Sequence, residues 1–329
     1  MKTFVNANAR DFKEAATLAR QAARDGKSAA FSGGGSDLLG LIKEGIAAPD
    51  VVVNLRSVRN AQRVQDASGG LTIGGLTTLD DLSRDGAVRQ RFAVLAEAAE
   101  TVATPQIRNV ATVAGNVCQR PWCWYYRNGF PCFKAGGRTC FSPTGENQFH
   151  AIFGGGPSYI VHPSDLAPAF VALDATFRIA GPSGERTLPA ADFFVLPREN
   201  AARENVLAND EVLTAVQVPA IARDTRTTYN KIMDREAWTH AVVSAAVVLQ
   251  MDQGVCRAAR IVLGGVAPIP WRLPQVERLL AGQRITAELA ARAGEVAVEG
   301  AMPLPKNRYK VPLVQSLVKR TVLDLATRT

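Results

Sequence analysis

Long hydrophobic runs are missing from this sequence of 329 residues. No apolar stretch approaches the ~20 residues that a membrane-spanning helix needs, and Met1 to Asn6 contain no signal-peptide core. We therefore expect no membrane segment and no export signal. The predicted location is the cytoplasm, or the periplasm if an exported partner carries the chain there.

Blocks of basic residues are also missing, although positive charge is in excess. The chain has 38 Lys and Arg against 30 Asp and Glu, a formal net charge of +8, and its basic residues are interleaved with acidic ones. A nucleic-acid-binding protein gathers such an excess on one patch or tail. We therefore expect no nucleic-acid partner, and the charge suits an anionic cofactor or an acidic partner subunit.

Histidine is scarce, with three residues in the chain, and no Ser-His-Asp or two-carboxylate arrangement is recognisable. His162 and His240 have no partner pattern, so we expect packing or surface roles for both. The sequence therefore indicates no hydrolytic chemistry and no catalytic residue.

What is present is ample apolar material, 47% of the residues, and a length that favours two domains at ~150 residues each. Strand and helix patterns alternate as βαβαβ up to residue 55, with a helix predicted from Asp11 to Arg24. Residues 219–224 resemble a domain boundary. Beyond it, strands at 227–232, 241–250 and 258–263 precede three helices, which predicts the class α+β.

A glycine-rich loop follows a predicted strand and precedes a predicted helix. Successive backbone N–H groups at such a point suit a pyrophosphate, since glycine lets the ligand approach closely. The spacing departs from G-x-G-x-x-G, so the alternative of a tight strand-to-helix turn stays open. The loop comprises Phe31, Ser32, Gly33, Gly34, Gly35, Ser36, Asp37 and Leu38.

A second segment with glycine and hydroxyl side chains runs from Thr104 to Asn116. Its small residues suit a phosphate or ribityl chain, and the alternative is a packed turn. Together with Val161 to Pro168, Tyr229 to Lys231 and Trp271-Arg272, the two segments resemble the FAD subunit of the xanthine dehydrogenase family. That family includes aldehyde oxidoreductases, carbon monoxide dehydrogenase and 4-hydroxybenzoyl-CoA reductase, and the resemblance covers nearly the whole chain.

The resemblance implies a two-lobed FAD-binding domain of the molybdenum hydroxylase/vanillyl-alcohol oxidase type at residues 1–221. Its lobes would be 1–57 and 58–221, and a smaller α+β domain would occupy 224–329. FAD would be held by the glycine loop, by Thr104, and by the element matching T-V-G-G-N, in which Ala114 replaces a glycine. That element contributes Thr112, Gly115 and Asn116.

The resemblance also assigns residues to the flavin. Asp165 matches a polar anchor, Leu213 a residue that packs against the ring, and Lys231 a lysine near it. A cation there would stabilise negative charge that develops on reduction. The alternatives are an N-cap for Asp165, before a helix beginning at Leu166, and a solvated strand lysine for Lys231.

Four of the five cysteines lie within residues 118–150, an irregular and aromatic-rich stretch, in the spacing Cys-x4-Cys-x8-Cys-x7-Cys. Disulfides are disfavoured without a secretory signal, and structural zinc usually uses close C-x2-C pairs. An iron–sulfur cluster tolerates wider spacing and needs shielding by bulky side chains, which this loop offers. Cys256 lies in a segment with a strand-like sequence and is interpreted as a buried apolar residue.

Some members of the family carry a [4Fe–4S] cluster on a loop at this place, and residues 119–127 resemble its aldehyde oxidoreductase version. The resemblance implies Cys123, Cys132 and Cys140 as ligands. The fourth ligand is His150 by alignment or Cys118 by chemistry, with a slight preference for His150.

The predicted function is an FAD- and [4Fe–4S]-carrying electron-transfer subunit of a molybdenum hydroxylase, an aldehyde oxidoreductase in particular. The implied partners are a [2Fe–2S] small subunit, a large subunit with the molybdenum cofactor, and an external electron acceptor. Alternatives are a 4-hydroxybenzoyl-CoA reductase-like subunit, a stand-alone FAD oxidase of the vanillyl-alcohol oxidase type, and a zinc-binding adaptor.

Overall fold

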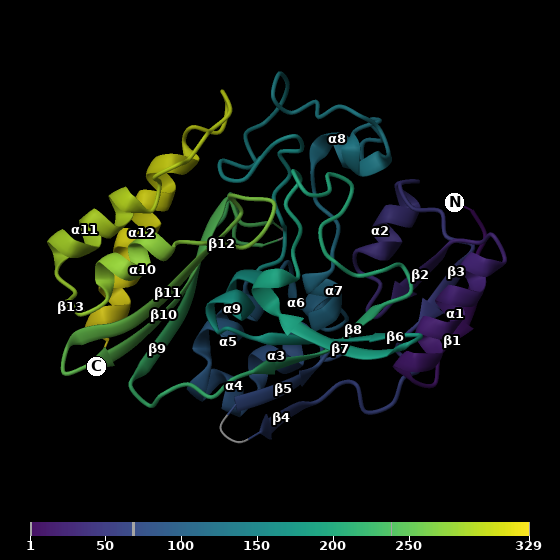
Figure 1. Cartoon of the computed structure of the whole chain (residues 1–329), viewed down its shortest axis with the longest axis horizontal. Coiled ribbons are helices and arrows are strands. Elements are labelled where there is room, and N and C mark those ends of the chain that lie inside the picture. The colour runs from purple at the N-terminus through teal and green to yellow at the C-terminus, as the bar shows by residue number, and fades with distance from the viewer. Residues whose placement is uncertain (1, 68–69, 238, 329) are drawn as a thin grey trace.

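The computed structural model describes residues 2–67, 70–237 and 239–328, and these form three β-sheets flanked by helices (Figure 1). The first sheet is parallel with the order β1-β3-β2. The first helix forms as predicted, and Asp11 caps it, because the Glu14 N–H donates to the Asp11 Oδ1 at 2.7 Å. The elements of this unit are β1 (Val5–Asn8), α1 (Phe12–Arg24), β2 (Ala29–Ser32), α2 (Leu38–Lys43) and β3 (Val51–Asn54).

The second sheet is antiparallel, with the order β4-β5-β8-β6-β7, and helices pack on it around the largest hydrophobic core. Its strands are β4 (Val64–Ala67), β5 (Gly70–Gly74), β6 (Thr176–Gly181), β7 (Gly184–Pro189) and β8 (Val212–Val218). The helices of this part are α3 (Leu79–Arg84), α4 (Gly86–Arg91), α5 (Ala93–Glu100), α6 (Pro105–Arg108), α7 (Val113–Val117), α9 (Leu166–Ala172) and the 3-10 turn η2 (Ala190–Asp192).

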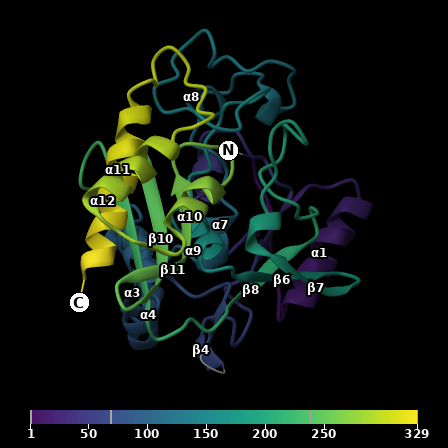
Figure 2. The same ribbon diagram turned by 60° about the vertical axis from the view of Figure 1, so that its left-hand side comes forward.

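The third sheet has the order β12-β11-β10-β9, and helices cover one of its faces (Figure 2). Side chains alternate along its strands. In β10, Ala246 and Val248 therefore face the largest core, while Val247 and Leu249 face the core beneath the helices. The sheet thus joins both cores. Its elements are β9 (Thr225–Ile232), β10 (Val243–Asp252), β11 (Val255–Gly264), β12 (Trp271–Arg272), β13 (Gln283–Arg284), α10 (Pro274–Leu280), α11 (Ala287–Val296) and α12 (Lys310–Thr327).

Residues 118–150 have little regular structure, as predicted. They contain one helical turn, α8 (Trp124–Arg127), and the 3-10 turn η1 (Phe133–Ala135). This segment, the cysteine loop, lies at the top of Figure 1, close to the chain that leads into α12. The mixture of helices and strands confirms the α+β class.

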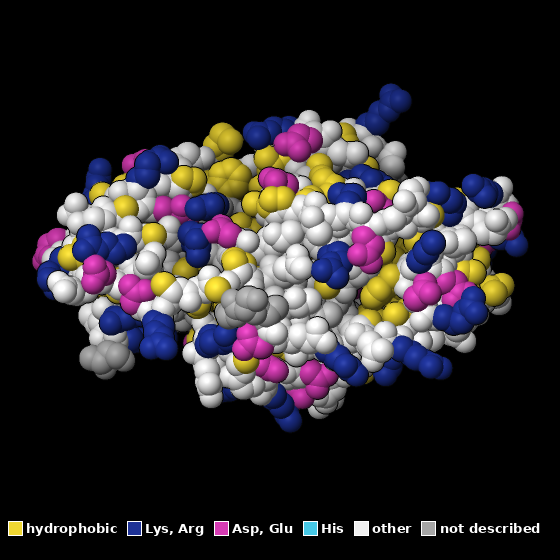
Figure 3. Space-filling model, turned by 60° about the horizontal axis from the view of Figure 1, so that its bottom comes forward, with side chains coloured by type: hydrophobic (Ala, Val, Ile, Leu, Met, Phe, Trp, Pro, Cys, Tyr) yellow, Lys and Arg dark blue, Asp and Glu magenta, His cyan; other side chains and the backbone are white. Residues whose placement is uncertain are grey.

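Surface charge is dispersed on the face shown in Figure 3, where Lys and Arg alternate with Asp and Glu. Within the described part of the chain, no helix combines the length and apolar character required to cross a membrane.

Candidate functional site

The glycine loop and the second glycine segment pack against each other. A Cβ on Gly34 would lie 1.7 Å from the Val110 carbonyl oxygen, and one on Gly33 would lie 2.9 Å from Thr112 Oγ1. Gly35 has φ +73°, a left-handed conformation that glycine adopts without strain. The close contact of two backbones therefore accounts for part of the glycine content of the loop, in addition to any ligand.

A cavity of about 290 Å³ opens at this junction. Five residues predicted from the sequence line it: Ser36, Asp37, Gly115, Asn116 and Asp165. Its other lining residues were not assigned to the site, although Ile107, Ala111 and Pro163 lie within segments that the sequence singled out. These other lining residues comprise Val102, Ala103, Ile107, Ala111, Gln119, Trp122, Pro163, Arg235, Thr239 and His240.

The α7 segment leaves room for a ligand in front of its glycine. Thr112 caps α7, since the Gly115 N–H donates to its Oγ1 at 3.1 Å. A Cβ on Gly115 would meet that Thr112 oxygen at 2.9 Å, and outside the helix's own backbone nothing else lies within 4 Å. Asn116 Oδ1 accepts from the Ser164 hydroxyl at 2.6 Å, which ties α7 to the Ser-Asp-Leu motif.

Asp165 is the centre of a buried polar group beside the cavity. Its carboxylate accepts from the Tyr229 hydroxyl at 2.6 Å and from Lys231 Nζ at 2.8 Å, and Lys231 also donates to the Thr101 carbonyl. Burial first, and then the Asp165 charge, raise the pKa of Tyr229 well above its usual value. Tyr229 is therefore a permanent hydrogen-bond donor to Asp165.

Both alternative interpretations of these residues are wrong. Asp165 makes no side-chain cap on α9; the neighbouring Ser164 Oγ accepts from the Ala167 N–H at 3.0 Å instead. Lys231 is not solvated, because 1% of its side chain is exposed. Asp165 lines the cavity and Lys231 does not, so the lysine charge acts on the cavity through Asp165.

Two further residues predicted to contact the flavin, Leu213 and Thr104, have structural roles. Leu213 lies on β8 in the largest core, and Thr104 caps α6 through the Ile107 N–H. Neither lines the cavity, so their contact with a flavin stays a prediction.

The cysteine loop brings its predicted ligands together. Cys123 Sγ lies 3.4 Å from His150 Nε2, and the backbone N–H groups of Tyr126 and Tyr125 donate to the Cys123 sulfur. Burial raises the pKa of the Cys123 thiol to about 11, the two N–H bonds lower it, and the nearby Cys132 and Cys140 thiols raise it. Cys123 and His150 are therefore in contact, and Cys132 and Cys140 lie near enough for their charge to act on the Cys123 thiol.

Cys118 lies elsewhere. It ends α7 and packs against the largest core, and burial raises the pKa of its thiol to about 12. Cys132 instead packs with Leu41 and Tyr126 in a small separate cluster. This arrangement favours His150 over Cys118 as the fourth ligand. Cys256 is buried in the core beneath the C-terminal helices, as predicted.

The His150 imidazole is held in its neutral form, which is the form that can coordinate a metal ion. Burial lowers the pKa of its imidazole to about 4, with a further lowering from the charge of Lys310. Its Nδ1 is buried without a hydrogen-bond partner. The described residues include no group of three His, Cys, Asp or Glu side chains gathered for a single metal ion.

The aromatic shield of the loop is partly buried. Tyr125 and Tyr126 are buried, and the Tyr125 ring contacts Phe130, Phe141 and His150 at centroid distances of 5.2, 5.9 and 6.1 Å. Trp122, Trp124 and Phe130 are exposed, so the bulky side chains that the sequence offers as a shield are only partly buried.

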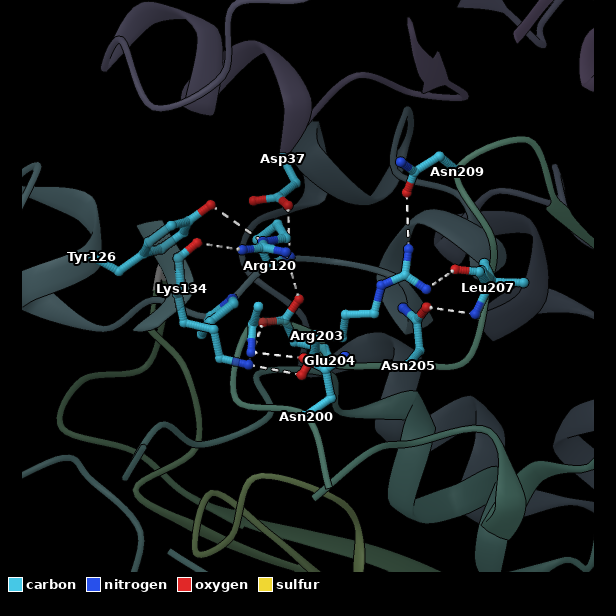
Figure 4. A network of polar contacts seen from close by, with 12 residues as sticks. Asp37, Arg120, Tyr126, Lys134, Asn200, Arg203, Glu204, Asn205, Leu207 and Asn209 are labelled. Carbon is cyan, nitrogen blue, oxygen red and sulfur yellow. Dashed lines mark hydrogen bonds and ion pairs between the residues drawn. The ribbon is translucent and has the colours of Figure 1, made fainter. Parts of the chain in front are cut away.

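A buried network of charges ties the loop to its surroundings (Figure 4). The Lys134 ammonium and the Arg120 guanidinium pair with Glu204 at 2.8 and 2.9 Å. The Arg120 N–H donates to Asp37 Oδ2, and the Arg127 guanidinium pairs with Asp37 Oδ1 at 2.8 Å. Asp37, predicted as part of the glycine loop, therefore connects that loop to the cysteine loop.

A second cavity, of about 430 Å³, separates the two candidate sites. Cys123 and His150 line it, and it shares Trp122, Pro163, Thr239 and His240 with the first cavity. The Trp122 and His240 rings lie 5.3 Å apart between the two. His240 thus has a place at the site that the sequence did not indicate, whereas His162 is buried against Phe194.

Two family models cover nearly all of the chain. The FAD binding domain in molybdopterin dehydrogenase matches residues 3–221, and the CO dehydrogenase flavoprotein C-terminal domain matches residues 228–325. The aldehyde oxidoreductase FAD-binding subunit PaoB of Escherichia coli is 32% identical over 99% of this chain and 98% of that relative.

Carbon monoxide dehydrogenase gives further matches. Its medium chain from Hydrogenophaga pseudoflava is 27% identical over 94% of this chain and 92% of that relative. A solved structure of carbon monoxide dehydrogenase from the same organism superposes with a TM-score of 0.77 and 26% identity, covering 98% of this chain and 96% of the other.

These matches define the class as a flavoprotein component of an oxidoreductase, which confirms the predicted flavin. The chain belongs to the FAD-binding subunits of the carbon monoxide, xanthine and aldehyde dehydrogenase family of molybdenum hydroxylases.

Proposed function

We propose that this chain is the FAD- and [4Fe–4S]-carrying electron-transfer subunit of a heteromeric aldehyde oxidoreductase. The observation that carries the proposal is the contact between Cys123 and His150, with Cys132 and Cys140 near enough to act on the Cys123 thiol, beside the proposed flavin cavity. The full-length similarity to an aldehyde oxidoreductase FAD-binding subunit supports the choice of substrate class.

FAD occupies the cavity at the junction of the two glycine segments. The backbone of the glycine loop at Ser36 and Asp37, which line the cavity, holds the pyrophosphate, while Gly115 and Asn116 leave room beside it. Asp165, held by Tyr229 and Lys231, anchors the flavin end. FAD suits an electron-transfer junction because it accepts electrons singly and can deliver them as a pair.

The residue types of the cysteine loop suit a four-iron cluster, because three thiols and one imidazole would supply one ligand to each iron. Cys123 Sγ and His150 Nε2 are in direct contact at 3.4 Å, so these two side chains would have to separate to reach different irons. Burial favours the neutral forms of the Cys123 thiol and the His150 imidazole, and iron would offset this cost by binding the thiolate and the neutral imidazole. N–H donors to the Cys123 sulfur tune such clusters.

The chain works with partners in this proposal. Electrons reach it from a large subunit that oxidises the substrate at a molybdenum cofactor, through a small [2Fe–2S] subunit, and leave to an external acceptor. The complex acts in the cytoplasm, or in the periplasm if a partner is exported. A 4-hydroxybenzoyl-CoA reductase-like subunit is the second candidate, since the same loop chemistry suits it.

Anaerobic purification of the chain with the proteins that accompany it tests the proposal. We expect two further chains, and bleaching of flavin absorbance when an aromatic or aliphatic aldehyde is added. A flavoprotein that purifies alone and oxidises substrate by itself would instead support the stand-alone oxidase.

A further inference from the structure

The last part of the cysteine loop is held almost residue by residue by the C-terminal part of the chain. Residues 146–151 lack helix and strand, and they lie beside residues 302–310, which lead into α12 (Figures 1 and 2). His150, the proposed fourth cluster ligand, is in the middle of this stretch.

Backbone carbonyls accept most of these bonds. Asn307 Nδ2 donates to the His150 carbonyl at 3.0 Å and to that of Ala151 at 3.3 Å. The Tyr309 hydroxyl donates to the Gln148 carbonyl at 2.9 Å, and Lys310 Nζ donates to the Phe149 carbonyl at 3.0 Å.

Side chains complete the contact. The Lys306 N–H donates to Asn147 Oδ1 at 2.9 Å, and its ammonium pairs with Glu146. Asn307 and Lys310 are fully buried, and Asn307 Oδ1 is itself fixed by the Leu304 N–H at 2.7 Å. Both donor and acceptor segments are therefore rigid where they meet.

The geometry points to Asn307 and Tyr309 as positioning residues for His150, so that the iron–sulfur site is built from both parts of the chain. This inference rests on the proposed cluster. A metal ligand must be held within about half an ångström of its place, and partners that orient ligands change metal affinity by roughly 10–100-fold. No strand or helix holds His150, so these hydrogen bonds fix its backbone.

The test compares three variants of the purified complex. Asn307→Ala removes both bonds to the loop, and Tyr309→Phe removes only one hydroxyl from a partly exposed ring. Thr321→Val is the control, because Thr321 is buried on α12, which follows the tested residues, and loses one hydrogen bond, that with Asn230, away from the loop. The rate of cluster bleaching in a chelator and the EPR spectrum of the reduced cluster are measured.

We expect Asn307→Ala to lose the cluster at least about tenfold faster, with an altered EPR spectrum. Tyr309→Phe should lose it a few times faster, while Thr321→Val and every variant's FAD content stay at the wild-type level. Equal bleaching rates and identical spectra in wild type, Asn307→Ala and Tyr309→Phe overturn the inference and leave the cluster standing. Wild type without iron overturns the proposed cluster itself.

Discussion

The proposed flavin cavity is lined mostly by loops, but these loops lie against α6 and α7, which pack on the largest hydrophobic core, whereas the cysteine loop beside it has only one helical turn and one 3-10 turn of its own. The flavin side rests on the largest hydrophobic core, and the loop rests on buried ion pairs and on hydrogen bonds from distant segments. Apolar burial stabilises the first region without a ligand. The second region keeps the Cys123 thiol buried beside the His150 imidazole, whose Nδ1 is also buried without a partner.

Substitutions at the cysteines should give the largest effect and separate the two regions most clearly. Replacing Cys123, Cys132 or Cys140 by Ser should remove the cluster completely, because a hydroxyl is a poor ligand for iron. His150→Ala should do the same, whereas Cys118→Ala should keep it, since Cys118 lies in the other core. Iron and sulfide content per chain measure this. Loss of the cluster in Cys118→Ala but not in His150→Ala would reverse the assignment.

A substitution on the flavin side should affect FAD binding separately from the cysteine loop. Gly115→Leu projects a side chain into the cavity, so we expect FAD affinity to fall about tenfold or more, which equals ~1.4 kcal/mol or more. Gly40→Leu on α2 is the matched control, as nothing lies within 4 Å of its Cβ position. Flavin released on dilution is measured by fluorescence. Equal retention in both variants would place FAD outside this cavity.

Charge, rather than apolar burial, should stabilise the loop. Lys134→Met leaves the Glu204 carboxylate buried with half of its ion pairs, so the free energy of unfolding should fall by roughly 3–5 kcal/mol. Adding Glu204→Gln should recover part of this loss. Chemical denaturation of the two variants and wild type gives the values. An unchanged midpoint for Lys134→Met would mean that the loop does not depend on this network.

The Asp165 group offers a smaller effect on the flavin. Lys231→Met removes the cation that neutralises Asp165, and the uncompensated carboxylate should disfavour the reduced flavin anion. We expect the flavin reduction potential to drop by on the order of 30 mV, or ~1.4 kcal/mol for two electrons. Spectroelectrochemical titration measures it. A raised potential would show that Asp165 does not face the flavin.

The stability of the core on the flavin side should depend on pH. Burial, and then the Lys134 charge, lower the pKa of His162 to about 3, so the folded protein leaves it neutral while the unfolded chain protonates it below about pH 6.5. The free energy of unfolding should therefore decrease as the pH is lowered from about 6.5 toward 3, by ~1.4 kcal/mol per pH unit from this residue. His162→Gln should flatten that slope in denaturation series at several pH values. Parallel slopes would show that His162 titrates normally.

The same contrast explains what the sequence could predict. The helix predicted from Asp11 to Arg24 and the strand predicted at 227–232 were recognisable, because local chemistry and periodicity determine both. The role of Asp165 as a carboxylate held by Tyr229 and Lys231, rather than as a cap, depends on segments far apart in the chain. His240 and the Asn307 contact with His150 likewise arise only when distant segments meet, so no local pattern could indicate them.

The central claim is that one chain carries a flavin in a core-supported cavity and a four-iron cluster in the loop beside it. Metal, sulfide and flavin analysis of the anaerobically purified complex, wild type against Cys123→Ser, tests this most directly. The account predicts one acid-releasable FAD per chain in both, and about four irons and four sulfides present only in wild type. One zinc per chain without this iron difference would contradict the cluster, and absence of FAD would contradict the account as a whole.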